Sequence, residues 1–323
     1  MDAPLIEVKN LTIRFHLQRG ILNAVQDVSF SLRAGETLGI VGETGCGKTV
    51  TSLSILRLIP SPPGEIAGGE VLYNGEDLLK KSEREMEKIR GRKISMIFQE
   101  PMTSLNPSLT VGEQISECYH VHMGHSRTVA REFTEHALQL VHLPSPKTLA
   151  GRYPHELSGG MRQRVMIAMA LACQPELLIA DEPTTALDVT IQAQILELLK
   201  ELQAKMKMAL IFISHNLGVV ARLCDRIGVM YAGSLVELSN KQSLFTHPLH
   251  PYTQALLNAI PRPDMRAEAL KAIPGSVCNL IDPPPGCKFH PRCSKAKEIC
   301  TAAMPRLESK SGENLAACYF PGV

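Results

Sequence analysis

A short run near the N-terminal end of the chain has the residue types and spacing needed to hold phosphate. It matches the pattern G-x-x-x-x-G-K-[ST] at every fixed position and reads Gly42-Glu43-Thr44-Gly45-Cys46-Gly47-Lys48-Thr49. Glycines let the backbone curl so that successive N–H groups face phosphate oxygens, and a following helix adds the positive end of its dipole. Lys48 is then expected to reach the β- and γ-phosphates, and the Thr49 hydroxyl to bind Mg²⁺. Cys46 is expected to offer only its backbone N–H, since no base is in evidence to activate the thiol.

A second group of candidate catalytic residues lies at the end of a later apolar run, which finishes in two carboxylates. The run is Leu177-Leu178-Ile179-Ala180-Asp181-Glu182. A buried parallel strand delivers its C-terminal residues to the ligand crevice of an α/β protein. Asp181 is therefore predicted to hold the Mg²⁺ shell, and Glu182 to polarise the water that attacks the γ-phosphorus. Alone, such a pair would be an ordinary solvated strand end; beside a phosphate loop, a catalytic pair is favoured.

The elements that must position these groups can be predicted from hydrophobic periodicity. Before residue 107 the sequence predicts one helix over 49–58 and strands over 6–15, 24–32, 37–41, 70–73 and 93–98. Apolar residues then recur at spacings of three and four, which predicts helices over 111–121, 128–141 and 161–173. Strand and helix alternate again over 176–180, 190–204, 209–213 and 217–223, before a closing hairpin over 226–231 and 234–238. The helical block therefore interrupts an α/β chain.

Composition excludes several classes of protein. The chain has 323 residues, of which 44% are hydrophobic, so it is predicted to bury a sizeable core rather than to be disordered. Lys and Arg number 34 against 32 Asp and Glu, a net charge of +2, which argues against a polybasic nucleic-acid protein. Neither a signal peptide nor an apolar run long enough to span a membrane is seen, and we expect a cytosolic chain.

Cysteines gather at the C-terminal end among many prolines. Of the nine in the chain, five lie between Cys278 and Cys318. Such clustering in a cytosolic protein favours metal binding over disulfides. The four that follow Cys278 have the spacing C-x5-C-x6-C-x17-C and are Cys287, Cys293, Cys300 and Cys318. This is neither the short spacing of structural zinc nor a standard ferredoxin run. Three alternatives remain open at this point: a metal centre of another kind, a zinc site in which His290 could be a ligand, and reduced free thiols.

One further motif identifies a family. Between the phosphate loop and the acidic strand stands Leu157-Ser158-Gly159-Gly160-Met161-Arg162-Gln163-Arg164, and Asp188 and His215 follow that strand. Over roughly residues 5–260 the sequence resembles an ATP-binding cassette (ABC) ATPase. The resemblance implies an α/β P-loop NTPase cassette with an antiparallel β subdomain and an inserted helical subdomain at about 105–172. It also implies a dimer, because Ser158, Gly159 and Gly160 at a helix start would form an anion site for the partner's nucleotide.

The resemblance assigns roles to other single residues. Gln99 matches the glutamine that senses Mg²⁺ and the attacking water, and His215 matches the histidine that hydrogen-bonds the γ-phosphate. Asp188 matches the residue that communicates across the dimer. Phe15 matches the aromatic residue that stacks on adenine, although a strand phenylalanine is more often part of a core.

Four details resemble one branch of the family, the ATPase subunits of oligopeptide, dipeptide and nickel importers. They are Met161 in the signature and the segments 102–107, 184–190 and 250–257. This branch implies a cassette over 1–240 and a small Cys- and Pro-rich extension over 241–323. It also implies a second, different ATPase chain, two membrane permeases, an extracytoplasmic solute-binding protein and a peripheral place on the cytoplasmic face of the cell membrane.

Segment 286–293 resembles the C-terminal motif of the same branch, some of whose members hold a [4Fe–4S] cluster by four cysteines. Cys287, Cys293, Cys300 and Cys318 would be those ligands here, and Cys278 a bystander. The competing functions are a soluble cassette ATPase that acts on nucleic acid or ribosomes, and a P-loop kinase or GTPase. The first usually needs a coiled-coil insert or two cassettes, and the second lacks the LSGG motif, so an importer ATPase without a nucleic-acid partner is predicted.

Overall fold

The protein is described here from a computed structural model, which covers residues 3–99, 104–185, 187–260 and 273–322. Of the residues quoted above, Met102, Thr103 and Ala186 lie outside this part. The chain forms two compact units. Unit 1 contains the chain up to Leu32, Thr37–Leu79 and the chain from Ser214, and unit 2 contains Arg33–Glu36 and Lys80–Ile213.

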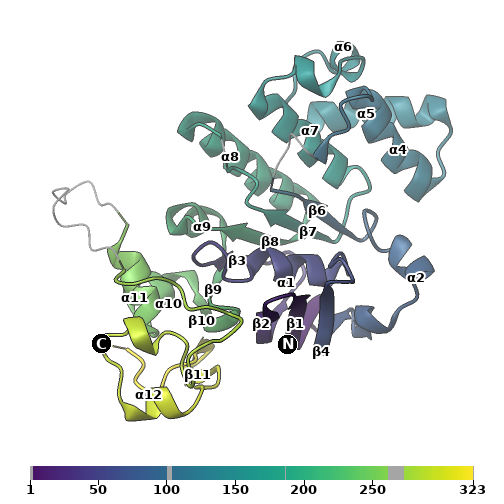
Figure 1. Cartoon of the computed structure of the whole chain (residues 1–323). Coiled ribbons are helices and arrows are strands. Elements are labelled where there is room, and N and C mark those ends of the chain that lie inside the picture. Colours follow the sequence, from purple (N-terminus) through teal and green to yellow (C-terminus); the bar gives the residue numbers. More distant parts are fainter. Residues whose placement is uncertain (1–2, 100–103, 186, 261–272, 323) are drawn as a thin grey trace. The chain divides into compact units, whose positions relative to one another are not determined.

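Unit 1 holds two groups of strands (Figure 1). The first is a four-stranded antiparallel sheet of order β2-β1-β4-β5, made of β1 (Ile6–Leu17), β2 (Gly20–Leu32), β4 (Gly64–Tyr73) and β5 (Glu76–Asp77). The second runs β11-β12-β10-β9-β3 and is made of β3 (Thr37–Val41), β9 (Arg226–Tyr231), β10 (Ser234–Asn240), β11 (Glu308–Ser311) and β12 (Asn314–Ala316). The antiparallel subdomain expected of a cassette is therefore confirmed.

The strands of unit 1 follow the sequence pattern closely. β1 alternates, with Ile6, Val8, Leu11 and Ile13 buried, as expected of a strand with one face on a core. β3 is buried at every position and pairs in parallel with β9, which suits a central strand. The helices of the unit are α1 (Lys48–Ile55), α9 (Leu217–Leu223), α10 (Lys241–Thr246), α11 (Pro251–Asn258) and α12 (Glu298–Ala302), with short 3₁₀ turns η1 (Leu78–Lys80) and η4 (His290–Arg292).

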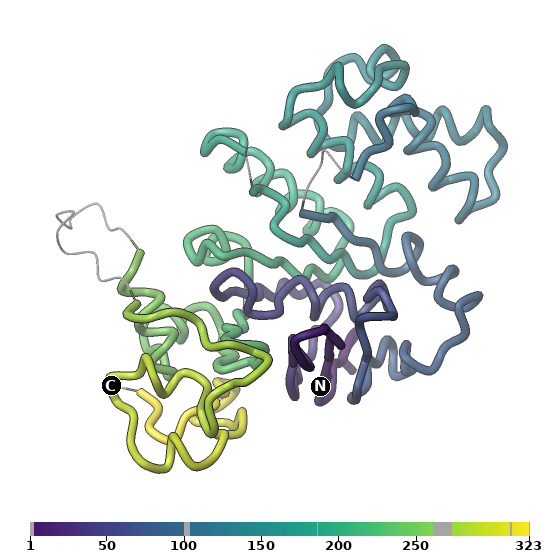
Figure 2. Tube along the Cα trace, in the orientation of Figure 1, coloured from purple at the N-terminus to yellow at the C-terminus, as the bar shows by residue number. Residues whose placement is uncertain are grey.

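The C-terminal segment differs from its prediction in one respect. Its many prolines predict a loop-rich segment, and most of residues 273–322 do form loops, but β11 and β12 form a hairpin there. β12 pairs antiparallel with β10, Leu238 opposite Leu315, so the segment adds two strands to an edge that β10 would otherwise leave open. Figure 2 shows the yellow C-terminal tube folding back beside the green hairpin of β9 and β10. The predicted division of the chain at residues 240 and 241 stays a prediction.

Unit 2 combines three parallel strands with a block of helices. The strands run β8-β7-β6 and are β6 (Ile94–Ile97), β7 (Leu177–Asp181) and β8 (Ala209–Ser214). Every residue of β7 and β8 is buried, as the continuous apolar runs predict. The helices are α2 (Glu83–Glu87), α4 (Val111–Met123), α5 (Arg127–Leu140), α6 (Pro146–Ala150), α7 (Gly159–Leu171) and α8 (Val189–Met206), with the 3₁₀ turn η2 (Pro154–Glu156). α4 to α7 contact one another in the stretch predicted to be helical.

Candidate nucleotide site and cysteine pocket

The phosphate loop joins β3 to α1 within unit 1, as its sequence predicts. Two of its glycines have backbone angles that side chains rarely adopt, with φ of +80° at Gly45 and +101° at Gly47, the residue that caps α1. A Cβ atom on Gly47 would also lie 2.6 Å from the carbonyl oxygen of Ala24. The curled loop therefore requires these glycines, and the N-terminus of an eight-residue helix follows directly.

Lys48 is the buried cation of this loop. Only 5% of the residue is exposed, and its Nζ atom donates to the carbonyl oxygens of Gly42 at 2.8 Å and Glu43 at 3.2 Å. Thr49 is half-buried in the first turn of α1. Cys46 is buried, and that burial raises the pKa of its thiol, which keeps it protonated and unreactive. The thiol therefore lacks the activation that a nucleophile needs.

In unit 2 the structure brings together two residues that the sequence separates widely. Gln99, just after β6, donates from Nε2 to Oε2 of Glu182 at 3.3 Å, and the Thr185 hydroxyl donates to the same oxygen at 2.9 Å. Glu182 has a φ of +46°, a strained conformation for a residue with a side chain and one that clusters at functional sites. Asp181 ends β7 and is buried. The glutamine and the carboxylate are thus oriented as one group.

The signature segment forms an exposed helix N-terminus. Ser158 caps α7, and its hydroxyl accepts a hydrogen bond from the N–H of Met161 at 3.3 Å. Ser158 and Gly159 are exposed, while a Cβ atom on Gly160 would lie 2.9 Å from a methyl group of Ile191 in α8. Close packing thus explains the second glycine, and exposure leaves the serine and the first glycine available to an anion.

The remaining residues of the predicted nucleotide site lie at ends or edges of elements. Asp188 caps α8 by accepting from the Ile191 N–H at 2.9 Å. His215 follows β8 and is exposed, and Asn216 beside it caps α9. Phe15 is half-buried on β1, opposite Gly64 of β4. The roles predicted for these residues stay predictions.

The structure shows contacts to the phosphate loop that the sequence did not suggest. They come from Tyr252 in α11 and from Arg292 in η4, and both reach Glu43. Arg292 forms an ion pair with Glu43, from which it is separated by 249 positions. The sequence near Arg292 gives no local signal of this contact, because an arginine among loop residues does not indicate a partner 249 positions away.

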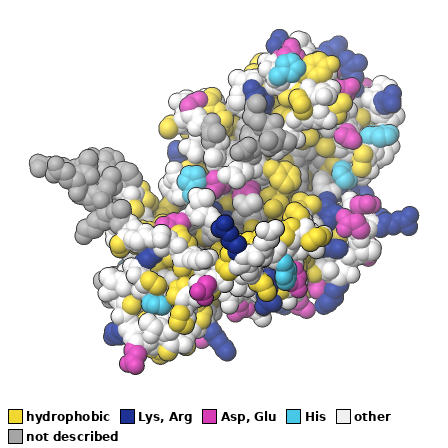
Figure 3. Space-filling view, viewed as in Figure 1, with side chains coloured by type: hydrophobic (Ala, Val, Ile, Leu, Met, Phe, Trp, Pro, Cys, Tyr) yellow, Lys and Arg dark blue, Asp and Glu magenta, His cyan; other side chains and the backbone are white. Residues whose placement is uncertain are grey.

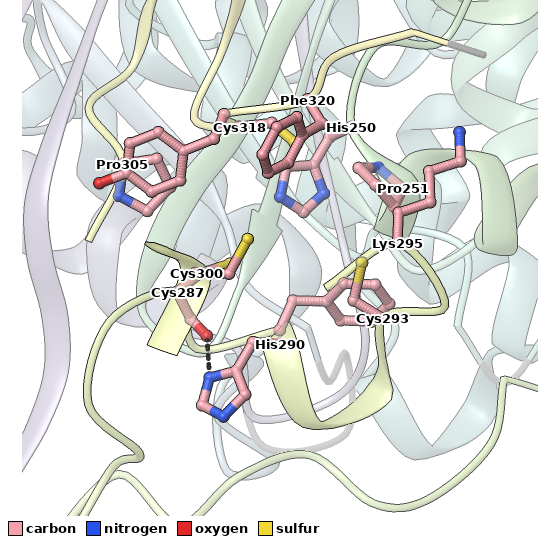
Figure 4. Close-up of a pocket in the computed structure, with 12 residues that line it drawn as sticks. His250, Pro251, Cys287, His290, Cys293, Lys295, Cys300, Pro305, Cys318 and Phe320 are labelled. Carbon is pink, nitrogen blue, oxygen red and sulfur yellow. Dashed lines mark hydrogen bonds between the residues drawn. The ribbon is translucent and has the colours of Figure 1, made fainter. Parts of the chain in front are cut away.

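The four late cysteines line one pocket in unit 1 (Figure 4). Cys287, Cys293, Cys300 and Cys318 are all free thiols, and Cys278 does not line this pocket. The rest of the lining includes His250, His290, Pro251, Phe289 and Phe320. Burial raises the pKa of the Cys287 thiol to about 11, and the nearby thiols of Cys300, Cys318 and Cys293 add to that rise.

Two histidines of this pocket have other hydrogen-bonding tasks. His250 caps α11, its Nδ1 accepting from the Tyr252 N–H at 3.0 Å, and burial lowers its pKa to about 3. Nδ1 of His290 lies 2.9 Å from the carbonyl oxygen of Cys287, the dashed contact of Figure 4. Across the described residues, no three His, Cys, Asp or Glu side chains are placed to hold a single metal ion.

The visible face of the molecule carries charges of both signs, as the near-neutral net charge predicts. Figure 3 shows Lys and Arg side chains intermingled with Asp and Glu over the visible face. Among the described residues, no helix is both long enough and apolar enough to span a membrane.

Comparison with known proteins places the chain in a family. The sequence profile of the ABC transporter family matches residues 25–185, and that of the oligopeptide/dipeptide transporter C-terminal region matches 236–300. The oligopeptide transport ATP-binding protein of Escherichia coli is 50% identical, over 98% of this chain and 93% of its own. The dipeptide transport ATP-binding protein of Bacillus subtilis is 48% identical, over 98% and 94%.

Solved structures agree with this assignment. A dimeric bacterial ABC transporter cassette superposes with a TM-score of 0.66 at 29% identity, covering 73% of this chain and 98% of its own. The same cassette bound to ADP and phosphate superposes equally well, at 28% identity. Membership of the ABC ATPases indicates that the chain uses ATP and Mg²⁺. The chain therefore belongs to the ABC transporter ATPases, in the branch whose members are ATP-binding proteins of oligopeptide and dipeptide transport.

Proposed function

We propose that this chain hydrolyses ATP on the cytoplasmic face of the cell membrane and thereby drives peptide uptake through membrane permeases. The observation that carries the proposal is the P-loop around Lys48, built as a phosphate cradle, in a chain whose C-terminal part matches the peptide-transporter profile. Relatives named for dipeptide and oligopeptide transport favour peptides over nickel as the cargo. They also favour a transporter over a soluble cassette ATPase that acts on nucleic acid or ribosomes.

The P-loop residues Gly42 to Thr49 would bind the nucleotide phosphates, with the Lys48 ammonium on the β- and γ-phosphates. Bound Mg²⁺ would supply positive charge at the phosphate oxygens. Thr49, Gln99 and Asp181 are its proposed protein contacts, because hydroxyl, amide and carboxylate oxygens are ligands that Mg²⁺ accepts. Phe15 would stack on the adenine ring.

Hydrolysis would depend on a residue pair and a histidine. Glu182 would accept the proton of the attacking water, and its hydrogen bonds from Gln99 and Thr185 hold the carboxylate in place for that task. His215 would donate a hydrogen bond to the γ-phosphate. Together with Lys48, these groups stabilise the negative charge of the transferring phosphoryl group.

A second cassette would complete the site. The exposed N-terminus of α7, with Ser158, Gly159 and Gly160, would bind the γ-phosphate held by the partner's P-loop, and the partner would do the same in return. The similar solved cassette is dimeric, which supports this arrangement. The proposed partners are a second, different ATPase chain, two permeases and an extracytoplasmic solute-binding protein.

Affinity purification tests these partners. The tagged chain, expressed at its native level and extracted from membranes in mild detergent, should bring down integral permeases and a second cassette. Deletion of its gene should abolish uptake of a labelled peptide, and the wild-type gene should restore that uptake while a Lys48→Met gene should not. Recovery with ribosomes or nucleic acid instead, and peptide uptake unchanged by the deletion, would overturn the transport function.

The cysteine pocket is proposed to hold a [4Fe–4S] cluster with a structural role. Four free thiols line one pocket, as such a cluster requires. A cubic cluster binds each of its four cysteine sulfurs to a different iron, so it needs four thiols around one pocket. Its binding would stabilise a Pro-rich segment with little core of its own.

Serine substitutions test this assignment. Anaerobically purified wild-type protein should contain about four irons per chain with matching sulfide. Cys293→Ser should lose most of that iron and lower the melting temperature by about 4 °C or more, since metal-binding free energy contributes to folding. The matched control is Cys278→Ser, which removes a thiol of the same segment that lies outside the pocket and should keep the iron. Stoichiometric zinc without sulfide would establish the zinc alternative, and no metal would leave a packed tail of free thiols.

A further inference from the structure

The C-terminal segment reaches the nucleotide-binding loop through a two-pronged ion pair. Arg292 donates from its two terminal nitrogens to the two carboxylate oxygens of Glu43, at 2.8 and 3.1 Å. Its third nitrogen, Nε, donates to the carbonyl oxygen of Pro274 at 2.8 Å. Two parallel hydrogen bonds between planar groups set orientation as well as distance, so this pair restricts where Glu43 can lie.

The surroundings of Arg292 make the pair rigid. The Arg292 side chain is 5% exposed and the Glu43 side chain 28% exposed, so solvent screens this pair less than a surface pair. The guanidinium also lies over the rings of Tyr231 and Phe289, at 5.7 and 6.0 Å from their centroids. The Glu43 N–H in turn donates to the hydroxyl of Tyr252 at 3.0 Å, which holds the backbone of the same loop residue.

A second connection reaches the other end of the loop. Lys288 is buried, and its Nζ donates to the carbonyl oxygen of Ala232 at 2.7 Å and to the Ser234 hydroxyl at 3.1 Å. Gly233, within that turn, donates its N–H to the carbonyl oxygen of Cys46 at 2.9 Å. The short segment that carries Lys288 and Arg292 therefore supports the loop at both Glu43 and Cys46.

The ion pair also removes a negative charge that the loop would otherwise present to its ligand. Glu43 places a carboxylate on a loop whose task is to bind a highly charged anion, and an unpaired carboxylate there would repel the phosphates. Arg292 cancels that charge, and its guanidinium keeps its own charge at every physiological pH. Without Arg292, the loop would lose a support and also gain an uncompensated negative charge beside the ligand.

We propose that Arg292 is a positioning residue for ATP binding, which acts through Glu43 by fixing the P-loop and neutralising its carboxylate. This inference rests on the proposed function, namely that the loop around Lys48 binds ATP. It gives the C-terminal segment a role at the nucleotide itself, besides any role of its cysteines.

The test measures the dissociation constant for Mg-ATP by calorimetry on the full-length chain. Arg292→Met should weaken binding about tenfold, the effect of exposing one uncompensated charge to the ligand. Glu43→Gln should weaken binding less than Arg292→Met does, because it removes the repulsive carboxylate together with the support. The double variant should resemble Glu43→Gln, so that removing the carboxylate rescues the loss of the arginine. Added salt should shrink the defect of Arg292→Met.

Lys295→Met is the matched control. Lys295 lies near Cys293 in the sequence as Arg292 does, but it donates to the side chain of Gln254 in α11 and to the carbonyl oxygen of Gly322, neither of which belongs to the P-loop. The Lys295→Met substitution should disturb the C-terminal segment without changing Mg-ATP affinity by more than about twofold. In the assembled transporter, Arg292→Met should raise KM for ATP while kcat stays within about twofold, as expected for lost binding.

Several outcomes would overturn the proposal. Mg-ATP affinity of Arg292→Met within twofold of wild type would do so, as would a defect that Glu43→Gln fails to rescue. If Arg292→Met does not fold, Arg292→Lys replaces it in the test. Lysine keeps the charge but loses the paired geometry, so this variant should weaken Mg-ATP binding about threefold. Unchanged affinity in Arg292→Lys would also overturn the proposal. Absence of ATP binding by the wild-type chain would instead refute the proposed function. Wild-type binding that Lys48→Met abolishes and Arg292→Met leaves normal would refute only the role of Arg292.

Discussion

Glu182→Gln should lower the rate of ATP hydrolysis by about three orders of magnitude while leaving Mg-ATP affinity within about threefold of wild type. Glutamine keeps the size of the side chain and can still accept hydrogen bonds from Gln99 and Thr185. It has no carboxylate to take the proton of the attacking water, so the chemical step loses its base. Single-turnover hydrolysis in the assembled complex, with the partner's own site inactivated, is the measurement.

Glu176→Gln provides the matched control for this prediction. Glu176 lies just before β7, at the opposite end of the strand that leads to Glu182, and its exposed carboxylate pairs with Lys93 at 2.6 Å. Loss of an exposed pair costs about 1 kcal/mol of stability at most, so hydrolysis should stay within about twofold of wild type. Normal turnover in Glu182→Gln, with the partner site silent, would remove Glu182 from the catalytic role.

Lys48→Met should weaken Mg-ATP binding by more than about 100-fold, because a buried ammonium beside phosphate contributes several charge-assisted hydrogen bonds. Methionine keeps much of the aliphatic stem that is buried in the loop but offers no donor to Gly42, Glu43 or a phosphate. Equilibrium dialysis with radiolabelled ATP measures the affinity, and thermal unfolding without nucleotide reports whether the loop still folds.

Lys9→Met serves as the control for charge alone. Lys9 lies on β1 of the same unit, pairs with Glu7 at 3.1 Å and is 45% exposed, so its loss should leave Mg-ATP affinity unchanged. Wild-type affinity in Lys48→Met would show that the loop does not bind nucleotide in the way proposed. Equal losses of Mg-ATP affinity in both lysine variants would show that the effect comes from net charge rather than from the site.

Local patterns predicted most of the cassette. The strand, loop and helix around Gly42–Thr49 follow the prediction because this geometry depends on glycines and a helix start that are contiguous, with Gly47 leading directly into α1. β3, β7 and β8 were predicted because a strand buried on both faces must be apolar along its whole length. The hairpin of β11 and β12 was missed, since its residues are largely polar and its order comes from pairing with β10.

The sequence by itself thus determined which residues could hold phosphate and where a helix would present Ser158, and it predicted that four late cysteines belong together. Only the tertiary structure decided that Gln99 donates a hydrogen bond to Glu182, that the four thiols line one pocket, and that Arg292 forms an ion pair with Glu43. Caps, turns and periodicity are short-range effects that a few neighbouring side chains impose. Contacts across many residues depend instead on how whole elements pack, and the residue types at either end do not specify that packing.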